Sequence, residues 1–273
     1  WDNAVYHTGN MEVCALTGNK DYLQYSIDWA DYNQWKGATS NNKAEWRSTY
    51  GESPEYVLFG DWQVCFQTYA DLYKLDPDTI KIARAREVME YQMSTSKLDY
   101  WHWVDALYMV MPVMVKMYDI TKNPLYLEKL HQYLTVTDSI MYDREVGLYY
   151  RDAKYPYPFH KTINGKKDFW SRGDGWAFAA FAKVLKQLPA EDKYREEYIT
   201  RFQTMAKSIA ACQQPEGYWT RSLIDPEQAP GPETSGTALF TYGFLWGINN
   251  GLLNADIYSP IVEKAWNYLK TTA

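Results

Sequence analysis

The sequence predicts an all-α fold built from helical hairpins, and three observations support this. Apolar residues recur at helical spacing almost throughout, as in the segment 198–212. A weak repeat relates the segment that begins at Leu16 to the one that begins at Ile120, because in both a polar turn leads into a helix with a Tyr-Leu pair. No convincing alternating pattern predicts a long strand, although short extended pieces are expected near 147–152 and 217–223.

Five helical hairpins are expected along the chain. In each turn an Asp, Asn or Pro residue begins the second helix, as helix caps and first-turn prolines do. The first helices are expected near residues 2–16, 60–74, 102–119, 175–187 and 235–249. The second helices are expected near residues 20–35, 78–94, 123–141, 192–213 and 256–271.

The turns within the hairpins are short, and the links between hairpins are long. The long links are expected at residues 36–59, 94–101, 142–173 and 214–233. If the hairpins form a ring, these links lie at one end, where they lead into the first, inner helices. Because binding sites are commonly built on loops held by a rigid scaffold, we expect a functional site at that end.

Composition and charge exclude several classes of protein. The 273 residues are 46% apolar and 23% charged, which is enough for a substantial core and is unlike a disordered chain. The net charge of −6 and the pI near 5.3 argue against a nucleic-acid partner, and no apolar stretch is long enough for a membrane span. The chain opens at Trp1 without Met or a signal sequence, so the N-terminus has been cut or is not shown. For the soluble bacterial protein that we expect, the sequence leaves a periplasmic or a cytoplasmic localisation open.

Residues that bind metals form no pattern here. Cys14, Cys65 and Cys212 are far apart and each lies in an apolar helical pattern, so we expect buried thiols. The four His residues show no ligand spacing, and no metal site is predicted. The aromatic content is the outlier, with 12 Trp, 25 Tyr and 9 Phe residues. Trp and Tyr present a flat apolar face with a polar edge, which suits the C–H face of a sugar.

Polar and aromatic residues gather where four of the inner helices are expected to begin. Asp61 falls at the start of the second, and Asp105 about one turn into the third. The other two starts carry the clusters Trp170, Arg172, Asp174 and Trp176, and Glu233, Thr234 and Ser235.

Simpler interpretations stay open for most of these residues. Asp61, Asp174 and the Thr234–Ser235 pair fit helix caps, and Arg172 fits a surface ion pair. Asp105 fits a cap poorly, because it lies among Trp, Val, Leu and Tyr residues inside an expected helix. Burial of a carboxyl group raises its pKa, as a general acid requires near neutral pH.

The segments "WVDALYM", "FWSRGDGW" and "PETSGTALFTYG" resemble those of the unsaturated uronyl hydrolases of glycoside hydrolase families 88 and 105, which include the unsaturated rhamnogalacturonyl hydrolases. The likeness covers nearly the whole chain. It implies an (α/α)6 barrel with its pocket at the mouth, in which this chain has one hairpin missing or incomplete. We therefore expect a single barrel domain over residues 1–273, truncated at one or both ends.

The resemblance also implies roles for particular residues. Asp105 falls on the catalytic general acid/base, and Asp61 on a second active-site Asp. Trp170, Arg172 and Trp176 fall on the family's substrate-binding motif. We also count Arg151, His102, Thr234 and Ser235 among the candidate substrate-binding residues.

The chain departs from the family's pattern at two positions. The family often has Asn where this chain has Asp174, and many members have an active-site His where this chain has Arg151-Asp152. His160 lies nearby but does not align with that His. Both departures concern substrate preference more than reaction type.

The chemistry that the resemblance implies is hydration of the C4–C5 double bond of a terminal unsaturated uronic acid, derived from galacturonate or glucuronate, on an oligosaccharide produced by a lyase. Protonation at C4 and addition of water at C5 give a hemiketal that opens and releases the next sugar. One carboxyl group can serve as acid and then as base, and no metal or organic cofactor is required.

Other functions remain open at this stage. A related helical-barrel enzyme, such as a sugar epimerase with His bases or an inverting glycosidase with two separated carboxyl groups, is the main alternative. A helical-repeat scaffold that binds carbohydrate without catalysis is the other. An activity assay on a disaccharide separates the scaffold from the enzymes, and analysis of the product separates the enzymes from one another.

Overall fold

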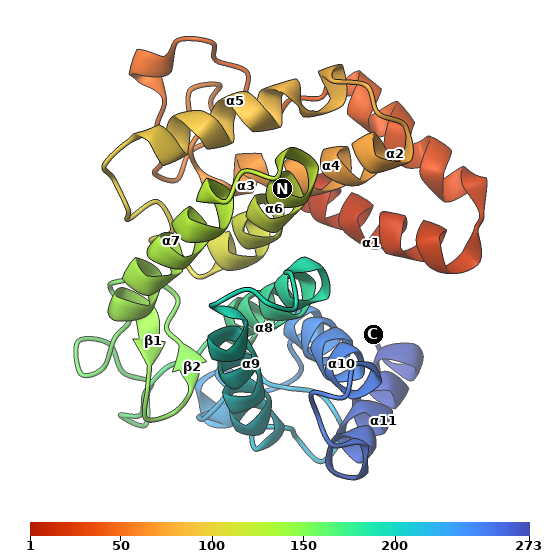
Figure 1. Cartoon of the computed structure of the whole chain (residues 1–273). Helices are drawn as coiled ribbons and strands as arrows, with labels where there is room; N and C mark the ends of the chain where they lie inside the picture. Colours follow the sequence, from red (N-terminus) through yellow and green to blue (C-terminus); the bar gives the residue numbers. More distant parts are fainter. The chain divides into compact units, whose positions relative to one another are not determined.

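A computed structural model describes all residues 1–273, and it confirms the all-α prediction. Five helical hairpins follow one another along the chain, with one two-stranded sheet between the third and the fourth (Figure 1). The chain divides into two compact units. Unit 1 comprises Trp1–Tyr100 and Met109–Tyr133, and unit 2 comprises Trp101–Tyr108 and Leu134–Ala273. None of the helices is both long and apolar enough to cross a membrane.

Unit 1 contains the first two hairpins. Its helices are α1 (Asp2–Thr17), α2 (Lys20–Tyr32), a short 3-10 helix η1 (Lys43–Glu45), α3 (Gly60–Gln63), α4 (Cys65–Leu75) and α5 (Ile80–Ser94). α1 packs against α2, α4 against α5, and α1 directly against α4. The turn predicted after Leu16 is present. Gly18 ends α1 in the left-handed conformation, and the Asn19 side chain caps α2 by accepting from the Asp21 amide.

The third hairpin consists of α6 (Asp105–Thr121) and α7 (Leu125–Met141), and both helices have residues in each unit. Within unit 1, the Gln67 side chain of α4 donates to the Met109 carbonyl at 3.3 Å, and Lys116 forms an ion pair with Asp71. Within unit 1, these contacts tie α6 to α4.

Unit 2 contains the last two hairpins and the sheet. Its remaining elements are β1 (Tyr142–Asp143), β2 (Leu148–Tyr149), α8 (Ser171–Gln187), α9 (Arg195–Ala210), a 3-10 helix η2 (Pro226–Gln228), α10 (Thr234–Asn249) and α11 (Ala255–Thr271). α8 packs against α9 and α10, and α10 packs against α11. A Cβ atom on Gly236 would lie 2.8 Å from the Ser171 carbonyl carbon, so this glycine lets the starts of α8 and α10 approach closely.

The short sheet is held by a buried ionic network. β1 and β2 are antiparallel, with Tyr142 opposite Tyr149. Arg201 of α9 lies 2.7 Å from Asp138 and donates to the Tyr149 hydroxyl at 2.6 Å, while that hydroxyl donates to Asp138 at 2.6 Å. The guanidinium also covers the Tyr142 ring at 3.7 Å. Because a charge removed from water must be paired, this network fixes the strands that lead into the long link before α8.

The long links are found where they were expected, although several helix boundaries differ. α8 begins at Ser171 rather than near 175, and α6 begins at Asp105 rather than near 102. The expected extended pieces appear as β2 and as an isolated bridge between Trp170 and Ser222. All three cysteines are free, but only Cys65 is buried, while Cys14 and Cys212 are partly exposed.

Candidate active site

Asp105 is the first residue of α6, not a residue one turn inside it. The residues before it are extended because they pair with another segment. The Val104 amide donates to the Arg151 carbonyl at 3.0 Å, and Trp103 forms an isolated bridge with Asp152. His102 lies in the same extended stretch and is partly buried. The partly buried Asp105 carboxyl group is therefore held at a helix start by the segment that follows β2.

The start of α8 lies against the residues that precede Asp105. A Cβ atom on Gly173 would come within 2.9 Å of both the Val104 side chain and the Trp170 ring, so only glycine permits this contact. Trp176, which is 4% exposed, packs against Tyr108 of α6 with ring centroids 4.6 Å apart. The motif around Gly173 and the segment that carries Asp105 are thus adjacent within unit 2.

Arg172 has an accessible and oriented guanidinium group. It lies over the Trp170 ring at 4.5 Å, and its side chain is 40% exposed. Its Nη1 atom is 3.9 Å from Oε1 of Glu233, so the two charges attract without a direct hydrogen bond. Arg172 is also in the first turn of α8, where backbone N–H groups favour an anion. This arrangement can receive a carboxylate.

Glu233 links the starts of α8 and α10. Its carboxylate accepts from the Gly236 amide at 2.6 Å, from the Ser171 hydroxyl at 3.0 Å, and from the Ser235 hydroxyl. Glu233 is therefore the N-cap of α10, and the interpretation of Thr234–Ser235 as the cap was wrong by one residue. The Thr234 hydroxyl instead bonds to the Tyr268 hydroxyl of α11 at 3.0 Å.

Asp174 is not a helix cap either. It is fully buried in α8, and its Oδ1 atom accepts a hydrogen bond from the Tyr149 amide of β2 at 2.8 Å. Its Oδ2 atom has no hydrogen-bond partner. Burial raises the pKa of Asp174 well above its ordinary value, because the charged form loses its hydration. In its protonated form an Asp side chain has the shape and the acceptor oxygen of Asn, the residue that the family often has at this position.

Arg151 is fixed by two aromatic rings. Its guanidinium lies 4.8 Å from the Trp103 ring and donates to the Tyr155 hydroxyl at 3.1 Å. The side chain is 34% exposed, and its distance of 3.8 Å from Asp152 is long for an ion pair. A positioned, accessible cation thus stands where many family members have a His.

A second network follows Arg151 and was missed from the sequence. The Tyr155 ring lies 4.4 Å from the ring of His160, whose Nε2 atom is 2.9 Å from Asp168. Arg221 also donates to Asp168, at 2.6 and 2.7 Å. Burial would raise the pKa of Asp168, but the bonds from Arg221 and His160 hold it below its ordinary value. These residues lie in irregular links, where no periodicity shows which side chains meet.

Asp61 lies in unit 1, where it is the second residue of α3. Phe59 is the N-cap residue, and no side chain caps α3, so the interpretation of Asp61 as a cap was wrong. Asp61 faces a pocket of about 340 Å³, whose wall consists of Trp1, Asp2, Tyr50, Gly51, Glu52, Phe59, Asp61 and Trp62. Burial raises the pKa of Asp61 to about 6. This carboxyl group can change its protonation state near neutral pH.

The structure brings most of the predicted residues into one unit. Unit 2 contains Asp105, His102, Arg151, Trp170, Arg172, Trp176, Thr234 and Ser235. Direct contacts connect the segments around Asp105, Arg151, Arg172 and Glu233, although the hydroxyl of Thr234 bonds to α11. That Asp61 and Asp105 line one pocket stays a prediction.

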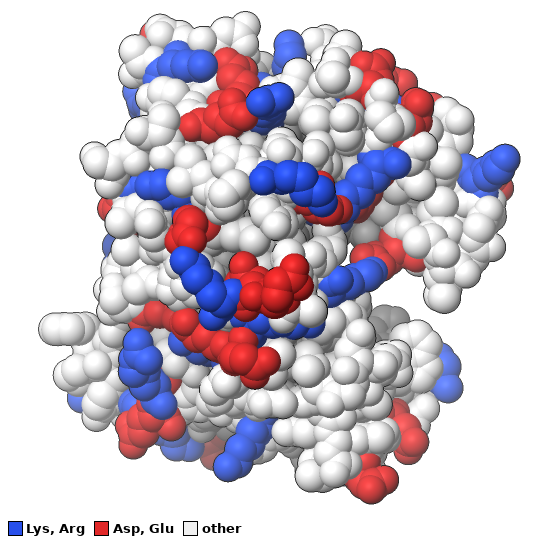
Figure 2. Space-filling model, viewed as in Figure 1, with Lys and Arg blue, Asp and Glu red and all other residues white.

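Charged groups outside these clusters are mixed in sign. On the face shown in Figure 2, Lys and Arg side chains are interspersed with Asp and Glu side chains. His7 of α1 is buried and contacts α2. It lies 3.0 Å from the Ser26 hydroxyl and stacks on Trp29 at 4.3 Å. His7 is therefore part of the packing of the first hairpin.

Comparison with known proteins identifies the family. The sequence model of glycosyl hydrolase family 88 matches residues 1–273. The chain belongs to this family. The resemblance to the unsaturated uronyl hydrolases is thereby confirmed, and with it the interpretation of the chain as a glycoside hydrolase.

One curated relative in Formosa agariphila is named "Unsaturated 3S-rhamnoglycuronyl hydrolase". It is 30% identical over 279 residues, an alignment that covers 98% of this chain and 72% of the relative. A family 105 glycoside hydrolase from C. acetobutylicum is 20% identical with a TM-score of 0.77, covering 98% of this chain and 76% of the other. At that identity the likeness shows the fold, which is that of the helical-barrel hydrolases.

A second solved structure is much more similar to this chain, but its name gives a different type of enzyme. It is named "Polysaccharide Lyase", is 71% identical with a TM-score of 0.99, and is covered over 77% of its length by the whole of this chain. Its name describes bond cleavage by elimination, whereas the family and the curated relative are hydrolases.

Proposed function

We propose that this family 88 hydrolase hydrates the C4–C5 double bond of a terminal unsaturated uronic acid on an oligosaccharide produced by a lyase. The observation that carries the proposal is the accessible Arg172, which is stacked on Trp170 and lies at the start of α8, the helix that contacts the segment before Asp105. A guanidinium group matches a carboxylate in a bidentate manner, and every substrate of this type has a carboxylate next to the double bond.

In the proposed reaction, Asp105 protonates C4 and positive charge develops at C5 and the ring oxygen. Water adds at C5 as Asp105 takes back a proton. The resulting hemiketal opens by breaking the bond between C5 and the ring oxygen. C5 becomes a ketone, and the former ring oxygen becomes a hydroxyl group on C1. The hemiacetal at C1 then breaks down to an aldehyde and releases the next sugar as an alcohol. Asp61 orients the sugar or the water, and in its ionised form both of its oxygen atoms accept hydrogen bonds and neither donates.

The aromatic residues have different roles in this proposal. Trp170 supports Arg172 and offers a ring beside it for a sugar face. Trp176 is nearly fully buried and is covered by Tyr108, so it positions the start of α6 against α8 rather than stacking on substrate. Arg151 adds a second accessible cation on the link that contacts the segment before Asp105.

The test is a panel of unsaturated disaccharides that differ in linkage and in the second sugar. The conjugated double bond absorbs in the ultraviolet, so hydration removes the absorbance as the second sugar is released. Wild-type protein is expected to consume at least one of these disaccharides, and the Arg172→Ala variant to need a much higher concentration of it. An intact protein that leaves all of them unchanged contradicts the proposal.

Elimination is the second candidate, because the 71% identical structure is named a polysaccharide lyase. The Tyr155–His160 ring pair, with Arg151 at the Tyr155 hydroxyl, is a set of groups able to exchange protons and neutralise a carboxylate. A base would remove the C5 proton, the C4–O4 bond would break, and the C4–C5 double bond would form. With a saturated uronate polymer as substrate, elimination would then increase the ultraviolet absorbance. Hydration of an unsaturated substrate decreases it.

A further inference from the structure

The link 36–59 forms part of the wall of the Asp61 pocket. Tyr50, Gly51 and Glu52 at its tip all line the pocket, and Tyr50 is 59% exposed. The Trp62 indole, which follows Asp61, donates to the Gly51 carbonyl at 2.9 Å. The position of this tip therefore determines the shape of the space in front of Asp61.

A buried arginine of α5 holds the other part of this link. The Nη2 atom of Arg84 donates to the carbonyl oxygens of Ala38 and Ser40 at 2.9 and 2.7 Å. Its Nη1 atom donates to Glu87 at 2.7 Å, and the side chain is only 6% exposed. Bonds of a charged donor in a buried setting are stronger than neutral ones. Arg84 thus anchors the beginning of the link to α5.

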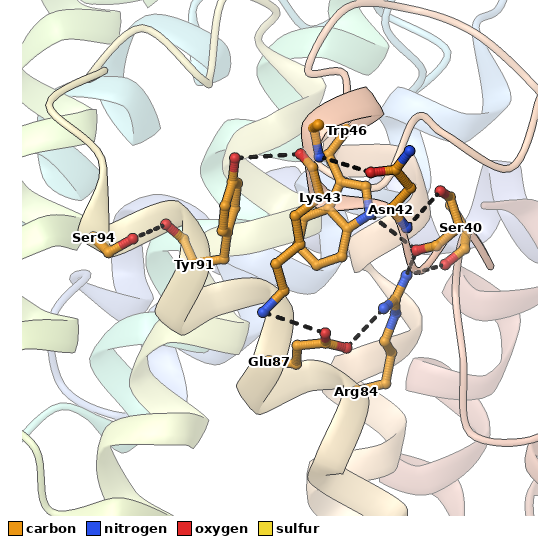
Figure 3. Close-up of polar contacts among 10 residues, drawn as sticks. Ser40, Asn42, Lys43, Trp46, Arg84, Glu87, Tyr91 and Ser94 are labelled. Atoms are coloured by element: carbon orange, nitrogen blue, oxygen red, sulfur yellow. Dashed lines mark hydrogen bonds and ion pairs between the residues drawn. The ribbon is translucent and has the colours of Figure 1, made fainter.

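Two further side chains complete the anchor, as Figure 3 shows. The Trp46 ring lies 5.0 Å from the Arg84 guanidinium, and its indole N–H donates to the Ser40 carbonyl at 2.9 Å. Lys43 approaches the second oxygen of Glu87 at 3.5 Å, so Glu87 bridges the link and the helix. The Ser40 carbonyl accepts from both Arg84 and Trp46, which makes it the point where the anchor converges.

Backbone bonds connect this anchor to the tip. The Ser40 amide donates to the Pro54 carbonyl at 3.0 Å, directly behind the tip. The Arg47 amide donates to the Glu55 carbonyl at 2.8 Å, and the Leu58 amide donates to the Arg47 carbonyl at 3.0 Å. Backbone hydrogen bonds therefore join the segment before the tip to the segment after it. A shift at Ser40 would move Pro54, and with it the neighbouring residues 50–52.

We propose that Arg84 is a positioning residue for substrate specificity. It holds the link 36–59 in place as the part of the pocket wall that contacts the aglycone, the sugar released by the reaction, and so determines which aglycone is accepted. This inference rests on the proposed function. Elimination abolishes the stereocentre at C4, so galacturonate and glucuronate ends give the same unsaturated sugar. An enzyme of this type can distinguish these two kinds of end only by the linkage and the next sugar. In unit 1, the exposed ring of Tyr50 and the carboxylate of Glu52 line the same pocket as Asp61 and can contact the next sugar.

The test compares two substrates that share the unsaturated uronate and differ only in the aglycone. One is the disaccharide that wild-type protein consumes best, and the other is the methyl glycoside of the same unsaturated uronate. Arg84→Lys keeps the charge but replaces two donor nitrogens, Nη1 bonded to Glu87 and Nη2 bonded to Ala38 and Ser40, with a single ammonium group on a differently shaped side chain. We expect kcat/KM to fall about 10- to 100-fold on the disaccharide and to change little on the methyl glycoside.

Arg86→Lys is the matched control. Arg86 lies on the same helix and pairs with Glu90 at 2.7 Å, but its side chain is 59% exposed and makes no bond to the link. The same chemical change there should leave both values of kcat/KM unaltered. In the Arg84→Lys variant, trypsin should also cleave after Lys43 or Arg47 faster than in the control, because the link has lost its anchor.

An equal loss on both substrates, or no loss on either, overturns the inference, because a purely structural role does not depend on the aglycone. If Arg84→Lys does not fold, Trp46→Phe replaces it, since that change removes only the donor to Ser40 and keeps a ring over Arg84. Failure of the proposed function would be seen differently: wild-type protein would then consume neither unsaturated substrate.

Discussion

Replacing Asp61 with Asn should stabilise the folded protein while it damages the activity. Burial raises the pKa of Asp61 from the ordinary 3.8 to about 6, so the folded state disfavours the ionised carboxyl group. The resulting loss of unfolding free energy is absent below about pH 4, grows as the pH rises towards and through about 6, and is complete above that. A rise of this size corresponds to about 3 kcal/mol as an upper bound. Asn has nearly the same shape and is never charged.

The assay is urea unfolding of wild-type and variant proteins at about pH 4 and about pH 8. The gain in unfolding free energy caused by Asp61→Asn should be larger at the higher pH, by up to about 3 kcal/mol. Asp28→Asn, at an exposed position of α2 in the same unit, is the matched control for the chemical change itself.

The activity of the same variant tests the role of the charge. If ionised Asp61 orients water or sugar, wild-type turnover should rise as the pH passes about 6, and the Asp61→Asn variant should lose this acidic limb along with most of its turnover. A variant that is more stable and less active marks a functional carboxylate. Equal destabilisation at both pH values, with the acidic limb retained, would refute the reasoning.

Three other substitutions follow from the site. Asp105→Asn should fold normally and lose about 10²- to 10⁴-fold in turnover on an unsaturated disaccharide, together with the alkaline limb of its pH profile, as steady-state rates over a pH series will show. Asp174→Asn should be as stable as wild type near pH 4 and more stable than wild type at alkaline pH, because burial raises the pKa of Asp174; thermal unfolding at both pH values checks this. Glu233→Gln should keep the cap on α10 but raise KM several-fold with kcat little changed, because Arg172 loses an orienting charge; a proportional fall in kcat would contradict that role.

Much of the fold could be predicted because helix formation leaves local signals. The turn after Leu16 illustrates this, since Gly18 and Asn19 have the conformation and cap that their residue types favour. Boundaries that depend on distant pairing could not be predicted in this way. The apolar spacing around Asp105 reads as helix from residue 102, but the backbone of Val104 bonds to Arg151, which shortens the helix.

Candidate residues could be recognised from the sequence where they have unusual neighbours. Asp105 among aromatic residues and Arg172 between Trp170 and Gly173 are examples. The roles of Asp174 and Glu233 were not predictable, because an acidic residue near a helix start fits a cap equally well until its partners are known. The Arg84 anchor gave no signal, since its partners are backbone carbonyls 44 and 46 positions away.

The most direct test of hydration at C4 and C5 follows the solvent atoms into the product. Wild-type protein is incubated with an unsaturated disaccharide in heavy water and, separately, in water labelled with heavy oxygen, and the products are examined by NMR and mass spectrometry. Hydration predicts solvent deuterium at C4, solvent oxygen at C5, an unlabelled released sugar and loss of ultraviolet absorbance. Solvent oxygen at C1 with the double bond and its absorbance intact would show direct cleavage of the glycosidic bond and would contradict the account.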